Sequence, residues 1–329
     1  MADKSSIEWT DATWNPTRGC SLVSAGCTHC YAMRQAHRFS GSGEAYEGLT
    51  RLTSDGPVWT GEVRLAEEKL EEPLHWKKPR RIFVNSMSDL FHESLPDEAI
   101  DKVFAVMALC PQHIFQILTK RPERMRDYIC NRDGWRRLTE CIFQTVSEHN
   151  LDETLLLGCI EELRINPAGP DECWVKIPLL NIHLGVSAEN QETADARIPW
   201  LLRTPAAMRF ISYEPGLGPL NLNNADDDGL RAGLKGALHW VIIGGESGPG
   251  ARPFDIQWAR TVIAQCKAAG VPVFVKQLGK LPHYPPAWIN GNDSLSPRTA
   301  IDLKDKKGAD WSESEWPEDL RVREYPKGI

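Results

Sequence analysis

The feature that most limits the fold of this chain is a series of short apolar runs, each of which ends in polar residues. Most of the runs are rich in Ile, Val or Phe, which is typical of strands buried on both faces. Helix-like stretches lie between them, and this alternation predicts a parallel α/β sheet with right-handed crossovers. The runs are RIFVNSMSD (81–89), HIFQILTKRP (113–122), NIHLGVSAEN (181–190), MRFISYEP (208–215), LHWVIIGGESG (238–248) and VPVFVKQLG (271–279).

A first strand is expected at SIEWTDATW (6–14), and the whole pattern predicts a partial or complete TIM-like (β/α) barrel. One of the predicted helices ends at Gly270, a residue suited to a helix C-cap. Another contains Pro199, near which we expect it to break. The helices are expected at 96–111, 190–204 and 254–270.

The predicted organisation is one barrel domain over 1–279 with a C-terminal extension, 280–329, that packs on it. Two segments are too long to be simple connections and are interpreted as insertions, at about 40–79 and 126–180. The first is polar and turn-rich, with a hairpin expected at VWTGEVRL (58–65). The second is expected to be helical.

Composition limits the functional class. The chain has 329 residues, of which 41% are hydrophobic and 25% charged, and no run approaches the length of a membrane span. Six of the nine cysteines are scattered singly, and the first residues lack an apolar signal segment. We therefore expect a reduced, cytoplasmic protein with no membrane association. The net charge of −7 gives no general support for binding to phosphate backbones.

Polar side chains follow each of the six apolar runs. Because the carboxyl ends of parallel strands meet at one edge of a barrel, we expect these side chains to line a common pocket. Asp89, Glu214 and Glu246 suit general acid–base chemistry. The strand-end residues are Asn85, Ser86, Ser88, Asp89, Thr119, Lys120, Ser187, Glu189, Tyr213, Glu214, Glu246, Ser247, Lys276 and Gln277.

Three cysteines lie close together in RGCSLVSAGCTHCYAMR (18–34), with the spacing C-x6-C-x2-C. A structural zinc site takes four ligands, and the chain has no second C-x2-C pair, so only His29 or His37 is at hand as the fourth. Three thiolates on a [4Fe–4S] cluster instead leave one iron open to an outside ligand. The count of ligands favours the cluster over zinc.

The position and spacing of these cysteines resemble those of radical SAM enzymes. Those enzymes carry three cysteines after the first strand of a partial barrel, usually as C-x3-C-x-aromatic-C. CTHC (27–30) is similar to the second half, with His29 at the aromatic position, whereas the first gap is six residues instead of three. GCTHCYAMR (26–34) and TKRPERM (119–125) resemble stretches of the spore photoproduct lyase branch.

The chain also resembles a phage-encoded family of unknown function that is known for a three-Cys motif. The similarity extends over nearly the whole predicted barrel, so it covers the fold as well as the cysteines. It implies no established substrate. The matching stretches are IEWTDATWNPTRGC (7–20), CTHCYA (27–32), NSMSDLFH (85–92), LTKRP (118–122), SYEPGLGP (212–219), GGESGPGARP (244–253) and VFVKQLG (273–279).

The radical SAM resemblance implies a [4Fe–4S] cluster on Cys20, Cys27 and Cys30, with S-adenosylmethionine bound at the open iron. A reductant for the cluster would allow cleavage of the C5′–S bond to a 5′-deoxyadenosyl radical. In such enzymes a Gly-Gly-Glu stretch at the end of the second strand contacts the methionine amine, whereas here it ends the sixth predicted strand. The residues implied in cofactor binding are Ser86, Ser88, Asp89, Ser187, Gly244, Gly245, Glu246 and Lys276.

The catalytic candidates are Tyr213, Glu214 and Lys120. Tyr213 is similar to a hydrogen-atom donor of the lyase branch, and the alternative is a tyrosine that is only hydrogen-bonded in the pocket. Resemblance to the lyase branch implies a nucleotide or nucleic-acid substrate and modification or repair of a base. Resemblance to the phage-encoded family implies a phage-encoded partner protein. Basic residues around Arg121 and the indole rings of Trp14, Trp59 and Trp76 are candidates to hold a base or phosphates. The alternative function is a non-catalytic protein that binds zinc or an iron–sulfur cluster and acts through a partner.

Overall fold

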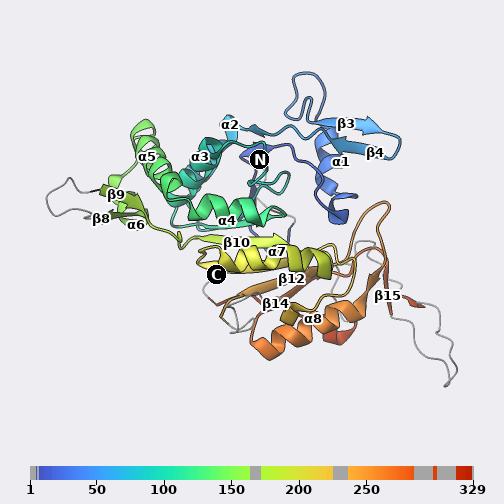
Figure 1. Ribbon diagram of the computed structural model, residues 1–329. Coiled ribbons are helices and arrows are strands. Elements are labelled where there is room, and N and C mark those ends of the chain that lie inside the picture. The colour runs from blue at the N-terminus through green and yellow to red at the C-terminus, as the bar shows by residue number, and fades with distance from the viewer. Residues whose placement is uncertain are drawn as a thin grey trace. The chain divides into compact units, whose positions relative to one another are not determined.

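The computed structural model describes residues 5, 7–163, 172–224, 236–284, 299–301 and 316–327 (Figure 1). The chain divides into two compact units. The first comprises Met1–Leu22, Ala32–Gly185 and Trp200–Met208, and the second comprises Val23–Tyr31, Val186–Pro199 and Arg209–Ile329.

Seven strands form the main sheet, and their hydrogen-bonded order, β1-β6-β7-β10-β11-β12-β14, is the same as their order along the chain. The pairings β1–β6, β6–β7, β11–β12 and β12–β14 are parallel. The predicted parallel α/β sheet is therefore confirmed, and among the described strands β1 and β14 are the two ends of an open order. The strands are β1 Ala12–Trp14, β6 Arg81–Val84, β7 Ile114–Thr119, β10 Ile182–Ser187, β11 Met208–Tyr213, β12 Trp240–Gly244 and β14 Val273–Gln277.

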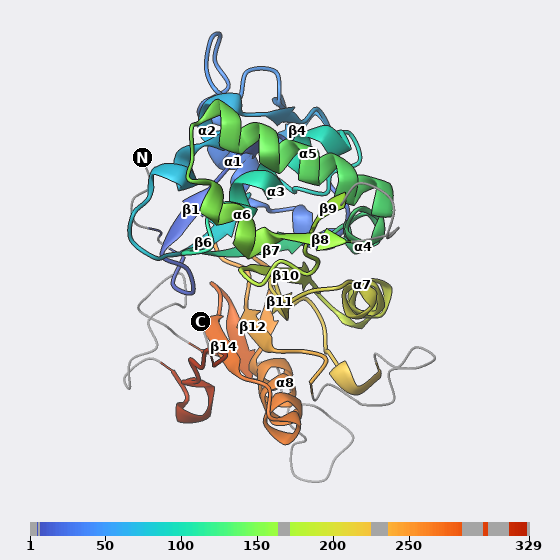
Figure 2. The same cartoon turned by 90° about the vertical axis from the view of Figure 1, so that its left-hand side faces the viewer.

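Helix α3, Asp97–Ala108, forms the centre of the first unit. It lies between α5, Arg132–Glu148, and the strands β6 and β7 (Figure 2). Nine of the twelve residues of α3 are buried, because the helix packs on both sides. Helix α4, Pro122–Cys130, begins directly after the end of β7 and carries Pro122 in its first turn, where a missing N–H costs no helical hydrogen bond.

The first insertion contains a hairpin, but its position differs from the predicted one. Strand β3, Thr50–Thr53, pairs with β4, Gly56–Trp59, and β5, Arg64–Leu65, pairs with β2, Thr17–Arg18. The prediction of a hairpin over 58–65 was wrong because the two halves of that stretch pair with different partners. Helix α1, Tyr31–His37, precedes this insertion, and α2, Glu67–Leu70, and the 3₁₀ turn η2, Glu72–His75, follow β5.

The second insertion is helical in part. After α5 come the 3₁₀ turn η3, Glu153–Leu155, and the short helix α6, Leu156–Cys159. An antiparallel hairpin that the sequence did not predict follows, formed by β8, Ile160–Leu163, and β9, Glu172–Val175.

In the second unit α8, Ile256–Ala269, packs beside β14 and follows the predicted bounds (Figures 1 and 2). The Asp255 side chain caps its first turn by accepting a hydrogen bond from the Gln257 N–H, and Gly270 ends it in the left-handed conformation. Helix α7, Gln191–Arg203, contains Pro199 without ending there, so the predicted break was wrong. The proline removes one backbone donor, and the helix continues past it.

The described part of the C-terminal extension covers the edge of β14. The Val275 N–H donates to the Val322 carbonyl, and the Glu324 N–H donates to the Val273 carbonyl. These bonds satisfy backbone groups that an edge strand would otherwise expose. Nearby, β15, Pro282–Tyr284, joins β13, Phe254–Asp255, to β16, Thr299–Ala300. The 3₁₀ turns η4, Leu222–Asn224, and η5, Glu318–Leu320, complete this unit.

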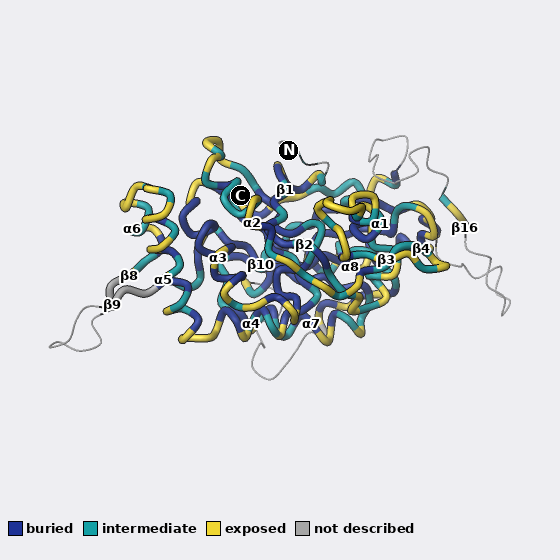
Figure 3. The backbone as a smooth tube through the Cα atoms, turned by 90° about the horizontal axis from the view of Figure 1, so that it is seen from above, coloured by how far each residue is buried: buried dark blue, intermediate teal, exposed yellow. Residues whose placement is uncertain are grey.

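Burial follows the sheet: all six residues of β10 and all five of β12 are buried (Figure 3). Consequently the side chains that follow the strands are held by a rigid layer. Among the described helices, none combines the length and the apolar content needed to cross a membrane.

Candidate functional site

The polar residues that follow the strands form hydrogen-bonded groups within each unit. Every predicted site residue lies in the described part of the chain. The first unit holds Cys20, Ser86, Ser88, Asp89 and Lys120. The second holds Cys27, Cys30, Ser187, Tyr213, Glu214, Gly244, Gly245, Glu246 and Lys276.

In the first unit, Asp89 is the centre of the group beyond β6 and β7. Its side chain lies 3.1 Å from the Arg121 guanidinium and is almost fully buried. Burial alone would lower the pKa of Arg121, but the neighbouring Asp89, Glu93 and Cys20 raise it above its usual value. Asp89 accepts hydrogen bonds from the Thr119 hydroxyl, from the Phe91 and Lys120 backbone N–H groups and from Arg121. Both oxygens of this carboxylate are therefore engaged by the chain itself.

Arg121 also fixes the segment that carries Cys20. One guanidinium nitrogen lies 4.0 Å from Cys20 Sγ, and another donates to Ser21 Oγ at 2.7 Å. The Ser94 N–H donates to His92 Nδ1, so His92 Nε2 carries the proton and donates to Ser21 Oγ at 2.8 Å. His92 is thus a donor to Ser21 and does not act as the base of a Ser–His nucleophile pair.

His92 is buried, and burial lowers its pKa, with the Arg121 charge acting in the same direction. The ring is therefore held in its neutral form, as its bonds to Ser21 and Ser94 require. A guanidinium beside Cys20 is the kind of surrounding that stabilises a thiolate, the form in which cysteine ligates metals. The sequence had placed Arg121 in a basic patch for phosphates, but its buried pairing gives it this local role.

The serines after β6 contact the loop after β1. Ser86 Oγ donates to Asn15 Oδ1, and Ser88 Oγ donates to the Thr17 carbonyl. Ser88 also forms an isolated parallel bridge with Gly19, next to Cys20. Ser86 and Ser88, which the sequence predicted to bind a cofactor, therefore fix the loop that leads to Cys20.

In the second unit, Cys27 and Cys30 lie in a tight turn that begins with the 3₁₀ helix η1, Ala25–Cys27. The Cys27 N–H donates to the Ser24 carbonyl, and the Cys30 N–H donates to the Cys27 carbonyl. Ser24 Oγ donates to Glu189 Oε1 at 2.8 Å. Glu189 follows β10, is 1% exposed and forms an ion pair with Arg197.

Ser187, the last residue of β10, contributes to the same group through its backbone. Its carbonyl accepts a hydrogen bond from the Arg197 guanidinium, and its side chain is buried. Arg197 thereby ties the end of the strand to Glu189.

Glu246 follows β12 and contacts the other side of the cysteine turn. His29 Nδ1 lies 3.2 Å from Glu246 Oε2, and Arg252 donates to both carboxylate oxygens. Burial raises the pKa of Glu246, but the hydrogen bonds from Arg252 and His29 and the Arg252 charge outweigh burial, so the pKa lies below its usual value. The carboxylate is therefore ionised and accepts a hydrogen bond from His29 Nδ1.

A third carboxylate, Glu214, follows β11. Its Oε1 accepts hydrogen bonds from Lys276 Nζ at 2.8 Å and from the Gln277 side-chain amide at 2.7 Å. Both partners come from the end of β14, so these predicted residues do lie together. Tyr213, the neighbour of Glu214, is 0% exposed and donates its hydroxyl to the Gly218 carbonyl.

Close packing leaves no room for a side chain at either glycine of the Gly-Gly-Glu stretch. A Cβ added to Gly244 would lie 2.9 Å from the Glu214 carboxyl carbon, and one added to Gly245 would lie 2.3 Å from the Leu278 carbonyl oxygen. Both glycines therefore permit close packing between neighbouring strand ends.

Several residues of these groups were not singled out as ligands or catalysts from the sequence. They are Arg197 and Arg252, which pair with strand-end carboxylates, and Ser21 and Ser24, which lie in the cysteine loop. Ser21 and Ser24 could have been found from their position beside the cysteines, whereas Arg197 lies within α7 and has no comparable signal in the sequence. Two tryptophans proposed to stack on a base, Trp14 and Trp59, are buried, so their rings are not available for stacking. Trp76 is partly exposed and lies under the Arg80 guanidinium.

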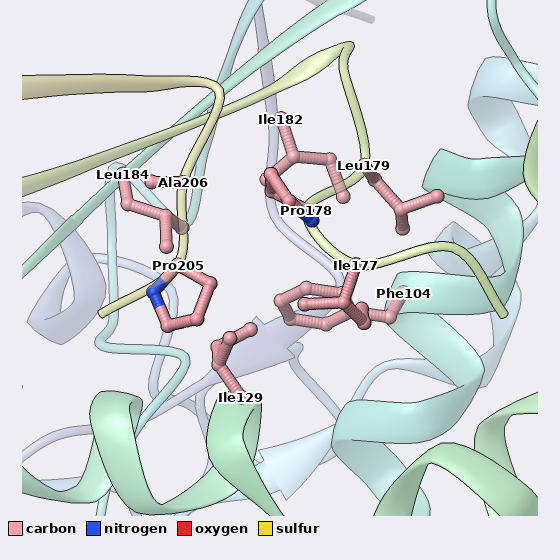
Figure 4. A pocket seen from close by; sticks show the side chains of 9 residues that line it. All are labelled: Phe104, Ile129, Ile177, Pro178, Leu179, Ile182, Leu184, Pro205 and Ala206. Carbon is pink, nitrogen blue, oxygen red and sulfur yellow. The ribbon is translucent and has the colours of Figure 1, made fainter. Parts of the chain in front are cut away.

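An apolar crevice in the first unit is a different kind of feature (Figure 4). Phe104 of α3 and Ile129 of α4 face Pro178 and Pro205 across it, and all nine lining side chains are apolar. A binding site needs a few convergent polar groups to orient a ligand, and this crevice offers none from its side chains.

Cys20, Cys27 and Cys30 are free cysteines of intermediate exposure, and cysteine thiolates are the ligands that iron–sulfur clusters take. Among the described residues no three or more Cys, His, Asp or Glu side chains are gathered as a metal site. Cys20 belongs to the first unit and the C-x2-C turn to the second.

A model of a known protein family matches residues 4–318 of the chain. The chain belongs to the family described as "Protein of unknown function (DUF5131)". The match includes all three cysteines and every strand-end residue described above. No curated protein and no solved structure matches this DUF5131 member.

Proposed function

We propose that this DUF5131 protein is a radical SAM-like iron–sulfur enzyme. Cys20, Cys27 and Cys30 would hold a [4Fe–4S] cluster, and S-adenosylmethionine would be the second cofactor. The observation that carries the proposal is the same in both units: the cysteine segment is hydrogen-bonded to residues that follow parallel strands. In (β/α) proteins that is where functional groups lie.

When bound and reduced by a one-electron donor, the cluster would supply the electron that cleaves S-adenosylmethionine to methionine and a 5′-deoxyadenosyl radical. Residues of the chain would stabilise and orient the cysteine ligands. Arg121 would favour the thiolate of Cys20 through its charge. Glu189 and Glu246 would fix the C-x2-C turn, and Glu214 with Lys276 would present a polarised pair near the end of β11.

The substrate class follows from resemblance to the spore photoproduct lyase branch. We infer a modified or damaged nucleic-acid base, or a nucleotide, as the substrate. The resemblance to a phage-encoded three-Cys family supports a phage-encoded partner protein. Most of the cysteines are scattered singly along the sequence, and from this pattern we infer a cytoplasmic protein.

The test is anaerobic purification of the full chain followed by assay of iron, sulfide and zinc. A brown protein that converts S-adenosylmethionine to 5′-deoxyadenosine with dithionite is the expected result. Cys20→Ala should abolish the iron, whereas Cys130→Ala, at an exposed cysteine outside the motif, should not. Unchanged iron in Cys20→Ala would remove Cys20 from the ligand set.

A second candidate function is a non-catalytic metal-binding protein that acts through a partner. It is favoured by the arginine pairing of Asp89, Glu189 and Glu246, which leaves these carboxylates engaged by the chain itself. A colourless protein that purifies with zinc would support this function and exclude the radical one.

A further inference from the structure

The cysteine turn of the second unit receives little support from apolar packing. None of the residues of η1 is buried, and Val23, just before the turn, is 44% exposed. Its internal backbone hydrogen bonds include those from the Cys27 N–H to the Ser24 carbonyl, from the Thr28 N–H to the Ala25 carbonyl and from the Cys30 N–H to the Cys27 carbonyl. Such a short turn does not hold its geometry alone, so side-chain contacts must set the orientation of the two thiols.

Two strand-end carboxylates provide those contacts. Ser24, three residues before Cys27, donates to Glu189, and His29, between the two cysteines, donates to Glu246. Gly26 lies directly on the first carboxylate, since a Cβ there would be 2.3 Å from Glu189 Oε1. The turn is thus attached at one point before Cys27 and one point after it.

The carboxylates are themselves fixed. Glu189 and Arg197 are 1% and 7% exposed and lie 2.9 Å apart. Glu246 is 7% exposed and receives the Arg252 backbone N–H at 2.8 Å as well as its guanidinium. A hydrogen bond from His29 to an ionised, immobile acceptor is stronger than one between neutral groups.

We propose that Glu246 is a positioning residue that fixes His29 and through it the C-x2-C turn, rather than a ligand of the methionine amine. This inference rests on the proposed function for its relevance to a cluster. It assigns the glutamate of the Gly-Gly-Glu stretch to holding the cysteine turn, because Arg252 and His29 together engage both of its carboxylate oxygens. The substitution that isolates the role is Glu246→Gln, which removes the charge and keeps the shape.

The first measurement is amide hydrogen exchange in the metal-free full-length protein. We expect Glu246→Gln to speed exchange of the Cys27 and Cys30 amides by about tenfold, the size expected for loss of one charge-assisted hydrogen bond. Exchange in α8 should stay unchanged. His29→Gln should give the same effect, and the double variant should be no faster than either single variant. Asp319→Asn, which removes a carboxylate from an exposed ion pair of the same unit, is the matched control.

The second measurement uses anaerobically reconstituted protein. Removing a negative charge beside the ligands should shift the midpoint potential of the cluster to a more positive value and hasten loss of iron to a chelator. Asp319→Asn should leave both unchanged. Unchanged turn exchange in Glu246→Gln, or additive effects in the double variant, would overturn the inference. Absence of iron from the wild-type protein would overturn the proposed function instead, while the exchange data would still decide the role of Glu246.

Discussion

Arg121 Nη1 lies 3.1 Å from Asp89 Oδ2, and the two side chains are only 5% and 8% exposed. Breaking a buried pair leaves the remaining charge without compensation in a medium of low dielectric constant. We therefore expect Asp89→Asn to lower the free energy of unfolding by about 3–5 kcal/mol. Urea denaturation of the full chain measures this loss.

The control is an exposed pair of the same unit, Arg136 with Glu140, whose side chains are 77% and 66% exposed. Water screens this pair, so Arg136→Gln should change the unfolding free energy by less than about 1 kcal/mol. A loss of similar size in both variants would show that burial does not make the Asp89 pair special.

Gly245 gives a steric prediction. A Cβ at this position would lie 2.3 Å from the Leu278 carbonyl oxygen, which belongs to the backbone and cannot rotate away. We expect Gly245→Ala to destabilise the protein by about 1–3 kcal/mol through displacement of the neighbouring strand end. A lowered midpoint of thermal unfolding checks it.

Gly158 is the matched position, because nothing lies within 4 Å of a Cβ added there and it belongs to the short helix α6. Gly158→Ala should be neutral or stabilise by up to about 1 kcal/mol, since alanine restricts the unfolded chain. Equal destabilisation by both substitutions would contradict the proposed packing role of Gly245.

The strands could be predicted from the sequence, whereas the contacts between strand ends could not. Runs such as RIFV and WVIIG are apolar because both faces of the strand are buried, and this pattern is local. The partners of Glu246 show the limit. Arg252 is six residues away, but His29 is separated by 217 positions, and no local pattern indicates which loop reaches that carboxylate.

The glycines illustrate the same point. GGES (244–247) resembles a cofactor-binding stretch, and sequence alone gives no reason to choose between a ligand contact and a packing constraint. The close approach of Glu214 and Leu278 supplies the packing reason. Likewise the buried state of Trp14 and Trp59 depends on the tertiary fold, so their aromatic rings could not be assigned to stacking from composition.

The lowered pKa of the buried His113 should make the stability of the protein depend on pH. Burial lowers its pKa, outweighing the backbone oxygens of Pro73 and Trp76, which favour the charged form. The unfolded chain therefore takes up a proton at a higher pH than the folded protein. The contribution of His113 is fully present above about pH 6.5, its unfolded pKa, and is lost as the pH falls toward the lower folded value.

Unfolding free energies measured between pH 7 and pH 5 should fall less steeply in His113→Gln than in the wild type. The slope for one proton is at most about 1.4 kcal/mol per pH unit. His75, which is exposed, serves as the control through His75→Gln. An identical slope in wild type and His113→Gln would mean that other histidines whose pKa is lowered, such as His239, carry the effect.

A substitution of Tyr213 distinguishes a structural role of this residue from a catalytic one. Its hydroxyl is buried and donates to the Gly218 carbonyl, and burial raises its pKa well above the usual value. Tyr213→Phe leaves that carbonyl without its donor, which should cost about 1–3 kcal/mol of unfolding free energy. The buried contact also predicts that the folded variant retains reductive cleavage of S-adenosylmethionine at the wild-type rate. Rates are compared at a temperature where thermal unfolding shows both proteins fully folded. A variant that is folded and retains its iron but produces no 5′-deoxyadenosine would instead make Tyr213 a participant in the reaction.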